Sequence, residues 1–568
     1  MAGTLDLHIA GDVLTAVMRY LAPALAALLL LRCAIPLLTF RQEPEVWGWL
    51  IMPDGERKAL KHWENLVGRH RKCDVVLELP TISRNHCVLT RYDDGSWTVT
   101  DTDSKGGVLV NDKQVSIGVL RTGDKLNLAG LELIFEPISP QQAKVLFGRR
   151  PKAPGPGSGL FNLILLTIFQ AASCMAFLLA DPGAHGREIV LGFGGIAAAQ
   201  WLLFFLYLLM RRSAFEVETL AFFLCTMGMA AICTVVPGEA VKQLIAVILG
   251  LIIFLAVGWA LRNQERAKVI RYLAGAAGVA LLAVTLVFGK EINGAKNWLI
   301  FGDHSFQPSE LAKICFVFVG ASTMDRLLHK RNIVLFIAYT VILCGFLALM
   351  NDFGTALIFF FAFLLIAYMR SGSVGTIALA CTALGFAGVI GVKLAPHALR
   401  RFTTWRHIWE DPFGAGYQQT RALICIASGG LLGIGVGQGK MKHIFAADSD
   451  MVFATISEEW GLVMGVLCVL CIVILALFAL RCAPVSRSSL YAIASCTAAG
   501  ILLVQTIFNA LGTVDILPLT GVNFPFLSNG GSSMMSVWGL LAFIKAGDTR
   551  RNASFAVHPI RFRRDEDE

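Results

Sequence analysis

Charged residues are scarce in this chain. Only 16% of its 568 residues are Asp, Glu, Lys or Arg, while 55% are hydrophobic and the mean hydropathy is +0.64. A soluble protein of this length carries far more charge. Uncharged apolar runs of about 20 residues recur, and each is long enough to cross a hydrocarbon core of about 30 Å. The composition therefore excludes a soluble multidomain protein and predicts a polytopic α-helical membrane protein.

The sequence also lacks a disulfide framework and a cleavable leader. Most of its 14 cysteines lie inside apolar runs, where cysteine behaves as a small hydrophobe. Cys468 and Cys471 form a C-x-x-C pair with no second pair, which favours packing over metal or redox chemistry. The apolar run from about Leu14 to Leu38 has no basic region before it and no small-residue cleavage site after it. We therefore interpret residues 1–44 as a membrane anchor helix.

The basic residues indicate a membrane topology. The net charge is +9, but the Lys and Arg residues stand in short loops between apolar runs, which argues against nucleic-acid binding. Dense basic clusters occupy alternate loops, and the positive-inside rule assigns that side to the cytoplasm. About twelve spans are expected after the anchor, beginning near residues 160, 188, 215, 240, 270, 308, 332, 354, 374, 452, 488 and 528. The N-terminus then lies outside, and a charged tail (548–568) lies in the cytoplasm.

A polar segment interrupts the apolar runs. Residues 45–137 contain short alternating stretches such as Trp47–Met52, His86–Tyr92 and Trp97–Asp101, separated by turns rich in Gly, Asp and Asn. This pattern is typical of a small all-β domain. Residues 138–159 follow, rich in Pro, Gly and basic residues, and predict an exposed linker. The fold class expected is mixed: an anchor helix, a cytoplasmic β sandwich and a polytopic helical domain.

Three motifs in the β segment resemble those of a forkhead-associated (FHA) domain, a reader of phosphothreonine. They are Gly68-Arg69, Ser83-Arg84-Asn85-His86, and Asp103-Ser104-Lys105-Gly106-Gly107 with Val110-Asn111-Asp112. A bound phosphate needs fixed cations and hydroxyl donors on loops. The resemblance assigns that role to Arg69, Ser83, Arg84 and Lys105, and a bracing role to His86. The family usually has Asn at the position of Gly106, so a β spacer with a remnant site is the alternative.

Polar blocks with unusual residues recur on the expected outer side. In chain order they are Gly294–Lys313, Asn351–Thr355, Trp409–Gln418, Ser428–Gly435 and Leu517–Ser533. Together and in this order they resemble the SEDS family (RodA, FtsW and SpoVE), polytopic glycosyltransferases that polymerise lipid II into peptidoglycan. The resemblance covers most of residues 270–547 and implies a SEDS-like domain over residues 160–547. It implies cell-wall synthesis in elongation, division or sporulation.

Glycan polymerisation needs a base for the acceptor hydroxyl and positive charge for the departing lipid pyrophosphate. The resemblance assigns the base to Asp411, which precedes Pro412 and Gly414; the alternative is that Asp411 caps that turn. Other polar residues of the outer blocks are expected to bind substrate. They are Lys296, Glu310, Lys313, Asp352, Arg400, Arg401, Lys442, Asp450, Ser528 and Ser532.

A divalent cation, Mg²⁺ or Mn²⁺, is the cofactor that the outer carboxylates suggest. Asp448, Asp450, Glu458 and Glu459 cluster in sequence, but spacing alone does not establish a metal site, and we assign no ligands. The glycine run 429–439 either offers backbone N–H groups to phosphate or forms a re-entrant turn. The chain departs from the SEDS pattern at Asn297, through residues 444–451, where Asp450 alone of the family's charged residues is kept, and at Asn529, which replaces a usual Tyr.

Two other functions stay open. A flippase for a lipid-linked sugar would need ionisable residues through the bilayer depth, and here they lie mainly at the outer mouths. A catalytically degenerate scaffold is kept open by the altered residues 444–451. The partners implied by the resemblances are lipid II and undecaprenyl lipid, a class B penicillin-binding protein, a phosphothreonine protein and a Ser/Thr kinase. The expected location is the bacterial cytoplasmic membrane.

Overall fold

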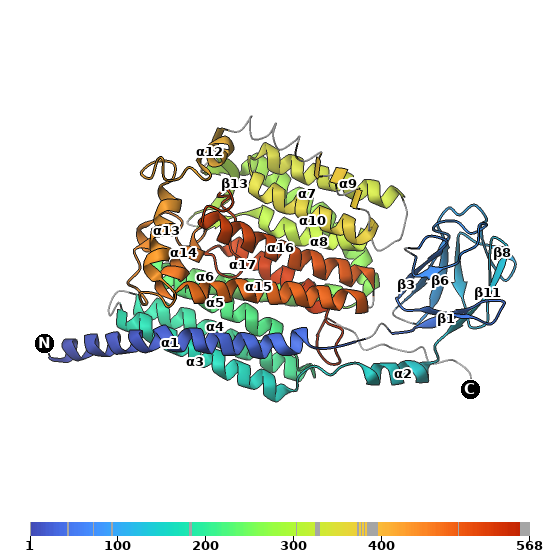
Figure 1. Cartoon of the computed structure of the whole chain (residues 1–568), viewed down its shortest axis with the longest axis horizontal. Helices are drawn as coiled ribbons and strands as arrows, with labels where there is room; N and C mark the ends of the chain where they lie inside the picture. Colours follow the sequence, from blue (N-terminus) through green and yellow to red (C-terminus); the bar gives the residue numbers. More distant parts are fainter. Residues whose placement is uncertain are drawn as a thin grey trace.

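The computed structural model describes residues 2–556, except 43–44, 72, 93–94, 181–184, 293, 303, 324–329, 372–373, 376–377, 380, 383–384, 386–395 and 487. Long helices lie side by side in one body, with the β domain beyond one end (Figure 1). Helices α12 and α13 lie at the opposite end. The two parts that carry the motifs of interest are thus separated by the length of the helical body.

The helical body is built from long apolar helices. Within the described residues, nine helices are long and apolar enough to cross a membrane. The chain is therefore a multi-pass membrane protein. Its long helices are α1 (Ala2–Leu38), α3 (Pro156–Ala180), α4 (Gly186–Leu209), α5 (Glu216–Val235), α6 (Ala240–Leu261), α7 (Gln264–Phe288), α8 (Pro308–Thr323), α9 (Lys330–Leu349), α10 (Phe353–Ser371), α15 (Leu462–Cys482), α16 (Ser489–Thr513) and α17 (Gly531–Ala546).

Short elements form the end of the body that is distant from the β domain. They are η1 (Pro237–Glu239), β12 (Lys290–Ile292), β13 (Ala295–Phe301), β14 (His304–Phe306), α12 (Pro396–Thr404), α13 (Tyr417–Gly429), η2 (Met441–His443) and α14 (Val452–Glu459). Strands β12, β13 and β14 pair as an antiparallel sheet. The sequence pattern did not predict this small sheet.

One expected span begins later than predicted. The apolar run from residue 452 forms two helices, because α14 ends at Glu459 and α15 begins at Leu462. Gly461 between them has φ +90°, a region that favours glycine. A Cβ at Gly461 would lie 2.3 Å from the carbonyl oxygen of Leu431. Glycine at this break therefore also lets the glycine run 429–439 pack closely against it. The span expected near residue 374 lies largely outside the described residues.

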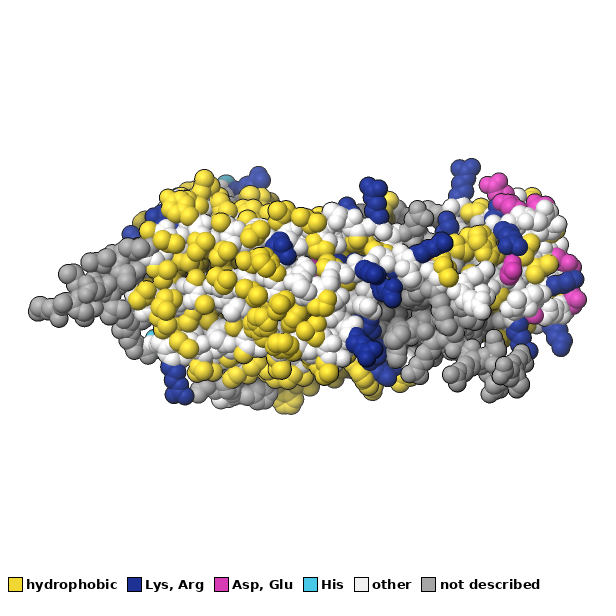
Figure 2. Space-filling view, turned by 90° about the horizontal axis from the view of Figure 1, so that it is seen from below, with side chains coloured by type: hydrophobic (Ala, Val, Ile, Leu, Met, Phe, Trp, Pro, Cys, Tyr) yellow, Lys and Arg dark blue, Asp and Glu magenta, His cyan; other side chains and the backbone are white. Residues whose placement is uncertain are grey.

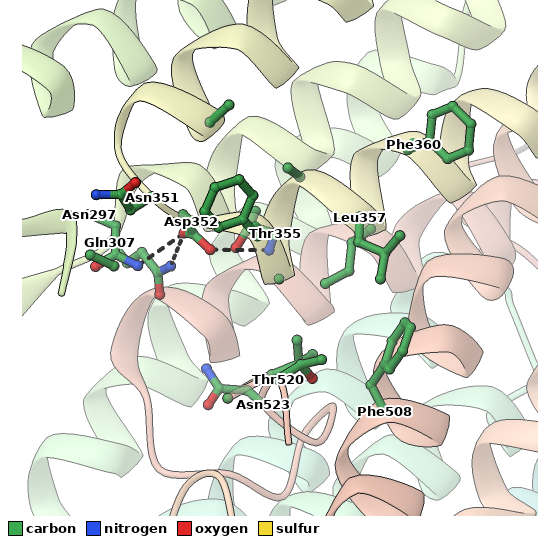
Figure 3. A pocket seen from close by; sticks show the side chains of 18 of the residues that line it. Asn297, Gln307, Asn351, Asp352, Thr355, Leu357, Phe360, Phe508, Thr520 and Asn523 are labelled. Carbon is green, nitrogen blue, oxygen red and sulfur yellow. Dashed lines mark hydrogen bonds between the residues drawn. The ribbon is translucent and has the colours of Figure 1, made fainter. Parts of the chain in front are cut away.

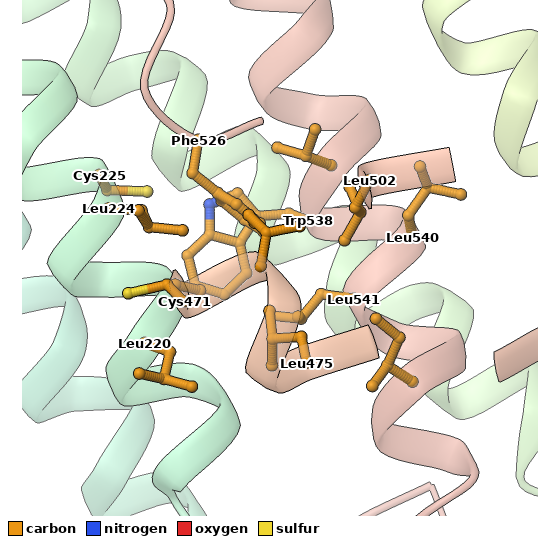
Figure 4. Packing of buried hydrophobic residues seen from close by; sticks show 14 of the residues in the cluster. Leu220, Leu224, Cys225, Cys471, Leu475, Leu502, Phe526, Trp538, Leu540 and Leu541 are labelled. Carbon is orange, nitrogen blue, oxygen red and sulfur yellow. The ribbon is translucent and has the colours of Figure 1, made fainter. Parts of the chain in front are cut away.

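Close packing around Trp538 holds the centre of the body together. The Trp538 ring is fully buried and contacts the rings of Phe222, Phe254 and Phe526, with centroids 5.0, 5.7 and 5.5 Å away. Figure 4 shows Phe526 beside Trp538 among leucine side chains. A Cβ at Gly250 of α6 would lie 2.6 Å from Cδ1 of Trp538. Gly250 therefore lets α6 and α17 approach, and such van der Waals contact is the main attraction between helices in lipid.

A buried charge network joins α5 to the C-terminal segment. Lys545 of α17 pairs with Glu218 of α5 at 3.1 Å, and Tyr207 donates a hydrogen bond to Glu218 at 2.7 Å. Arg550 pairs with Asp548 at 2.8 Å and with Glu216 at 3.3 Å. Each buried charge thus has an opposite partner, as burial requires. The sequence analysis missed this network.

The first residues of the expected C-terminal tail pack against the body. Asp548, Arg550, Ala553 and Phe555 are buried. The Arg551 N–H donates to the Pro151 carbonyl at 3.0 Å, and the Ala153 N–H donates to the Arg551 carbonyl at 3.3 Å. The linker is therefore not wholly exposed. It contains α2 (Pro140–Arg149) and pairs with the C-terminal segment.

The β domain is a sandwich of two sheets, as expected. Their strand orders are β2-β1-β11-β10-β7-β8 and β4-β3-β5-β6-β9. Trp97 and Phe135 meet edge to face in the core, 5.3 Å between centroids. The strands are β1 (Gly48–Ile51), β2 (Arg57–Leu60), β3 (Glu64–Gly68), β4 (Val75–Val76), β5 (Cys87–Arg91), β6 (Trp97–Asp101), β7 (Val108–Val110), β8 (Lys113–Gln114), β9 (Ile117–Leu120), β10 (Lys125–Leu128) and β11 (Leu131–Pro137).

The surface divides between the two parts. Figure 2 shows apolar side chains over the flank of the helical body and acidic side chains on the β domain. An apolar flank is what lipid contact requires. One direct contact between the parts is a hydrogen bond of 2.5 Å from the Ser489 hydroxyl to Glu64.

Candidate functional site: a cavity at the far end of the helical body

A cavity of about 1350 Å³ opens at the end of the body away from the β domain. Segments that are far apart in sequence line it, including α9, α10, β13, α12 and the loops 445–450 and 518–529. Its polar wall and its apolar wall are separate. The cavity therefore suits a molecule with a polar head and an apolar tail.

Asp352 organises the polar wall. Its carboxylate accepts hydrogen bonds from Asn297 Nδ2 at 2.9 Å, Gln307 Nε2 at 3.3 Å and the Thr355 N–H at 3.1 Å (Figure 3). Asp352 is buried, and the bond to Thr355 caps the start of α10. Asn297 comes from β13 and Gln307 from the residue before α8. Asp352 thus ties three elements into one polar surface.

Aromatic and aliphatic side chains form the other wall. Leu357 and Phe360 of α10 face the same space as Phe508 of α16 (Figure 3). Leu357 and Phe360 lie about one and a half and about two helical turns beyond Asp352 along α10.

Asp450 and Arg401 converge at the mouth of the cavity. Both residues line it, and a Cβ at Gly521 would lie 3.3 Å from Asp450 Oδ2 and 3.6 Å from Arg401 Nη2. Arg401 is held by a 2.8 Å hydrogen bond to the Thr520 carbonyl. Burial raises the pKa of Asp450 to about 6; the charge of Arg401 opposes the rise and that of Asp448 adds to it.

Asp411 does not line this cavity, as far as the described residues show. It is exposed, and its carboxylate accepts a 2.8 Å hydrogen bond from the Ala415 N–H. Its carbonyl accepts the Gly414 and Gly416 N–H groups. A Cβ at Gly414 would lie 2.2 Å from the Asp411 carboxylate. The geometry is that of the turn cap considered as the alternative in the sequence analysis.

The other predicted residues divide into two groups. Glu310, Asp352, Arg401 and Asp450 line the cavity. Lys313 is buried and pairs with Glu310 at 2.8 Å, so it reaches the cavity only through that partner. The remaining predicted residues make other contacts or none: Lys296 donates to Leu286, Lys442 donates to Gly437, Arg400 is exposed, Ser528 bonds Ser449, and Ser532 bonds Gln307.

Glu458 and Glu459 hold the glycine loop. Glu458 accepts the N–H groups of Lys440 and Met441 at 3.0 and 2.8 Å, and Glu459 accepts that of Gly439 at 3.1 Å. These three N–H groups, at the end of the glycine run and just beyond it, are therefore bound by carboxylates. The two glutamates are likewise engaged, and no cluster of three or more His, Cys, Asp or Glu side chains suited to a metal occurs in the described part of the chain. The divalent cation stays a prediction.

Sequence reasoning missed Asn297, Gln307 and Asn529 as cavity residues. Asn529 donates to Asp448 at 2.8 Å and to Glu239 at 3.0 Å. Asn297 and Asn529 had been noted as departures from a family pattern. Asn297 donates to a carboxylate that lies 55 positions away in sequence, and Asn529 donates to one that lies 81 positions away. Sequence periodicity does not reveal contacts over such separations.

The β domain brings its three motifs together at one group of loops. The Ser83 hydroxyl accepts the Lys105 N–H at 3.0 Å, and the Arg69 N–H donates to the Ser83 carbonyl at 3.0 Å. Buried His86 bonds the Gly107 carbonyl at 2.9 Å and accepts the Ser83 N–H, which is the expected bracing role. Arg69, Arg84 and Lys105 carry positive charge on or beside these loops, as a phosphate site requires.

The structure explains the missing Asn at position 106. A Cβ at Gly106 would lie 2.3 Å from the Cβ of Ala129. Ala129, with φ +53°, occupies the space of a longer side chain. The turn that contains Ala129 therefore leaves no room at position 106 for the Asn side chain that is usual in FHA domains.

Comparison with known families gives two matches. The model described as "cell cycle protein", covering FtsW, RodA and SpoVE, matches residues 237–552. The FHA domain model matches residues 65–129. The two matches cover the helical body from η1 onward and the loops that join the three β-domain motifs.

Curated relatives and one solved structure agree. The chain is 28% identical to peptidoglycan glycosyltransferase RodA of Mycobacterium tuberculosis, over 54% of this chain and 69% of that protein. It is 32% identical to probable peptidoglycan glycosyltransferase FtsW of Tolumonas auensis, over 50% of this chain and 75% of that protein. A chain of a solved peptidoglycan synthase complex, described as coordinating polymerization and crosslinking, is similar with a TM-score of 0.50 and 26% identity, over 58% of this chain and 96% of that chain.

Proposed function

Because the chain belongs to the FtsW, RodA and SpoVE family, we propose that it is a peptidoglycan glycosyltransferase that polymerises lipid II. The observation that carries this proposal is the two-sided cavity. Its Asp352-centred wall suits the sugar and its Phe360–Phe508 wall suits a polyprenyl chain. A single site thus accommodates both halves of a lipid-linked sugar.

We assign the general base to Asp450. It lines the cavity with Arg401 close by, and burial raises its pKa to about 6, which suits a base that works near neutral pH. In the reaction, Asp450 takes the proton of the acceptor hydroxyl while that oxygen bonds to the donor's anomeric carbon. The bond from this carbon to the pyrophosphate oxygen breaks, and the oxygen keeps the electron pair. Arg401 stabilises the charge of the departing pyrophosphate.

Asp411 caps a turn of its loop, and its predicted role as the base stays the alternative to Asp450. The hydrogen bonds of Asp411 to residues 414–416 fix the turn between α12 and α13. Asp352, Asn297 and Gln307 orient sugar hydroxyls, since each presents a donor or an acceptor on the cavity wall. A divalent cation that arrives with the pyrophosphate remains a prediction, and no step depends on it.

We also propose the orientation and the partners. The cavity faces outward and the β domain lies in the cytoplasm, in line with the positive-inside rule and with their positions at opposite ends of the body (Figure 1). The membrane is the bacterial cytoplasmic membrane. A class B penicillin-binding protein cross-links the glycan, which agrees with the similarity to a chain of a synthase complex. The β domain binds a phosphothreonine protein, the product of a Ser/Thr kinase.

Polymerisation of purified lipid II by the full chain in detergent tests the proposal. Wild type is expected to make glycan strands, and Asp450→Asn is expected to lose at least about 10²-fold in rate. Asp411→Asn keeps a hydrogen-bond acceptor in its turn and is expected to retain most activity. Loss in Asp411→Asn alone would move the base to Asp411. No product from wild type with its transpeptidase present would favour the scaffold function.

A further inference from the structure

Three aromatic rings lie exposed at the end of the body that carries the cavity (Figure 1). Phe413, in the turn before α13, is 80% exposed, and Phe445, in the loop after η2, is 69% exposed. Tyr417, the first residue of α13, is 38% exposed. Phenylalanine is among the residues most often buried, and an exposed group of apolar side chains marks a binding surface. We call these three residues the aromatic surface.

Arg421 and Gln418 of α13 hold the aromatic surface in place. The Arg421 guanidinium lies 5.7 Å from the ring centroid of Phe413 and 5.4 Å from that of Tyr417, which is within the range of a cation–π contact. Gln418 Nε2 donates to the Phe445 carbonyl at 3.1 Å and so ties the loop of Phe445 to α13. A surface that is held in this way loses little conformational freedom when a ligand binds.

The residues around the rings indicate contact with water. Glu410 and Asp411 precede Phe413, and both are exposed. The Glu410 carboxylate pairs with His407, also exposed, at 2.8 Å. Because carboxylates are costly in hydrocarbon, this loop lies outside the lipid chains. A ligand from water that suits rings beside amide and charged groups is a saccharide, since a sugar has an apolar C–H face and a rim of hydroxyl groups.

We propose that the aromatic surface binds the glycan strand outside the cavity. This inference rests on the proposed function, in which a glycan strand is extended at the cavity. Phe445 belongs both to the aromatic surface and to the cavity lining, so a strand on the rings stays next to the cavity. Phe445 also lies within residues 444–451, where the chain departs from the SEDS pattern. The surface keeps the strand bound between successive additions and thereby increases strand length.

Binding is tested without any need for activity. The probe is a short, soluble oligosaccharide of alternating N-acetylglucosamine and N-acetylmuramic acid, titrated against the full chain in detergent and followed by saturation-transfer NMR. Phe413→Ala and Phe445→Ala are each expected to weaken binding about three- to tenfold, because each removes one ring contact. Tyr417→Phe keeps its ring and should bind as wild type does. Unchanged binding in both alanine variants would overturn the proposal.

The control for binding is Phe205→Ala, which removes an exposed ring from α4, outside these loops. It should leave the affinity for the oligosaccharide unchanged. An equal loss of affinity in Phe205→Ala would mean that the sugar binds exposed rings without selection, which contradicts a specific surface.

Strand length is the second readout. With a limited supply of lipid II, Phe413→Ala and Phe445→Ala are expected to make shorter strands than wild type while they consume lipid II at a similar rate. Strands of wild-type length would overturn the proposal. Wild-type affinity for the oligosaccharide together with loss of a co-purifying transpeptidase would overturn it in favour of a protein partner. Ring-dependent binding by a chain that makes no glycan would support the saccharide surface and refute the proposed function.

Discussion

Lys545 and Glu218 form an ion pair of 3.1 Å with both side chains fully buried. Lys545 also donates to the Ala214 carbonyl at 2.9 Å, so the pair joins the end of α17 to the start of α5. Lys545→Ala leaves Glu218 without its cation and is expected to cost about 3–5 kcal/mol, measured by thermal unfolding in detergent. The double variant Lys545→Met/Glu218→Gln should recover most of this stability. Equal losses in both would contradict the pairing.

Asp450→Asn is expected to stabilise the protein while it stops polymerisation. The folded-state pKa of about 6 lies above the ordinary value of 3.8. Such a group contributes stability that is fully present below pH 3.8 and is lost as pH rises through 6. Asn removes this loss and should add about 1–3 kcal/mol at pH 7.5, and less at pH 4. Unfolding curves at the two pH values check the difference; a gain of the same size at both would argue against the pKa shift.

Arg69→Ala is expected to abolish phosphothreonine recognition by the β domain. The full chain in detergent should bind a phosphothreonine peptide with a Kd on the order of micromolar, measured by calorimetry. Removal of a charge-assisted contact should weaken binding at least about tenfold. Arg57→Ala on β2 is a matched control, since it faces Glu136 rather than the three loops. Equal binding of phosphorylated and plain peptides would refute phosphate recognition.

Gly106→Asn restores the residue usual in FHA domains but should destabilise this one. The new Cβ would meet the Ala129 Cβ at 2.3 Å, and a displacement of that size costs about 1–3 kcal/mol. Faster hydrogen exchange in β7 and β10 is the expected readout. Adding Ala129→Gly should reverse it, because that change removes the contacting methyl group. If the single variant exchanged as slowly as wild type, Ala129 would not be the obstacle.

Gly250→Leu is expected to separate α6 from α17. Its side chain would enter the space of the Trp538 indole, and the rearrangement should lower the unfolding temperature by several degrees. Gly194→Leu in α4 is the control, because an added Cβ at that exposed glycine meets nothing within 4 Å. A similar decrease in both variants would point to helix propensity rather than packing.

The sequence predicted the class of fold well because its signals were local. Apolar runs marked the helices, and alternation with turns marked strands such as β5 and β6. The break at Gly461 was missed because the surrounding run is uniformly apolar, and a glycine at φ +90° leaves no mark in a hydropathy pattern.

The site was predicted only in part. Asp352, Arg401 and Asp450 were selected because their residue types stand out in outer loops. The structure places all three on the cavity, and their roles in binding stay predictions. Asp411 was predicted as the base from a motif; its side chain caps a turn, and its catalytic role stays a prediction. The partners of Lys545 and Asn529 lie 327 and 81 or more positions away in sequence, so no spacing rule could pair them.

Helix α5 has a practical consequence for work on this protein. Its span is wholly enclosed by other helices, yet it ends at Val235, before the family match begins at residue 237. A fragment cut to the matched region would lose the helix that carries Glu216 and Glu218, which would leave Lys545 without its carboxylate partner and Arg550 with Asp548 alone. We therefore expect a stable fragment of the helical body to start upstream of α5.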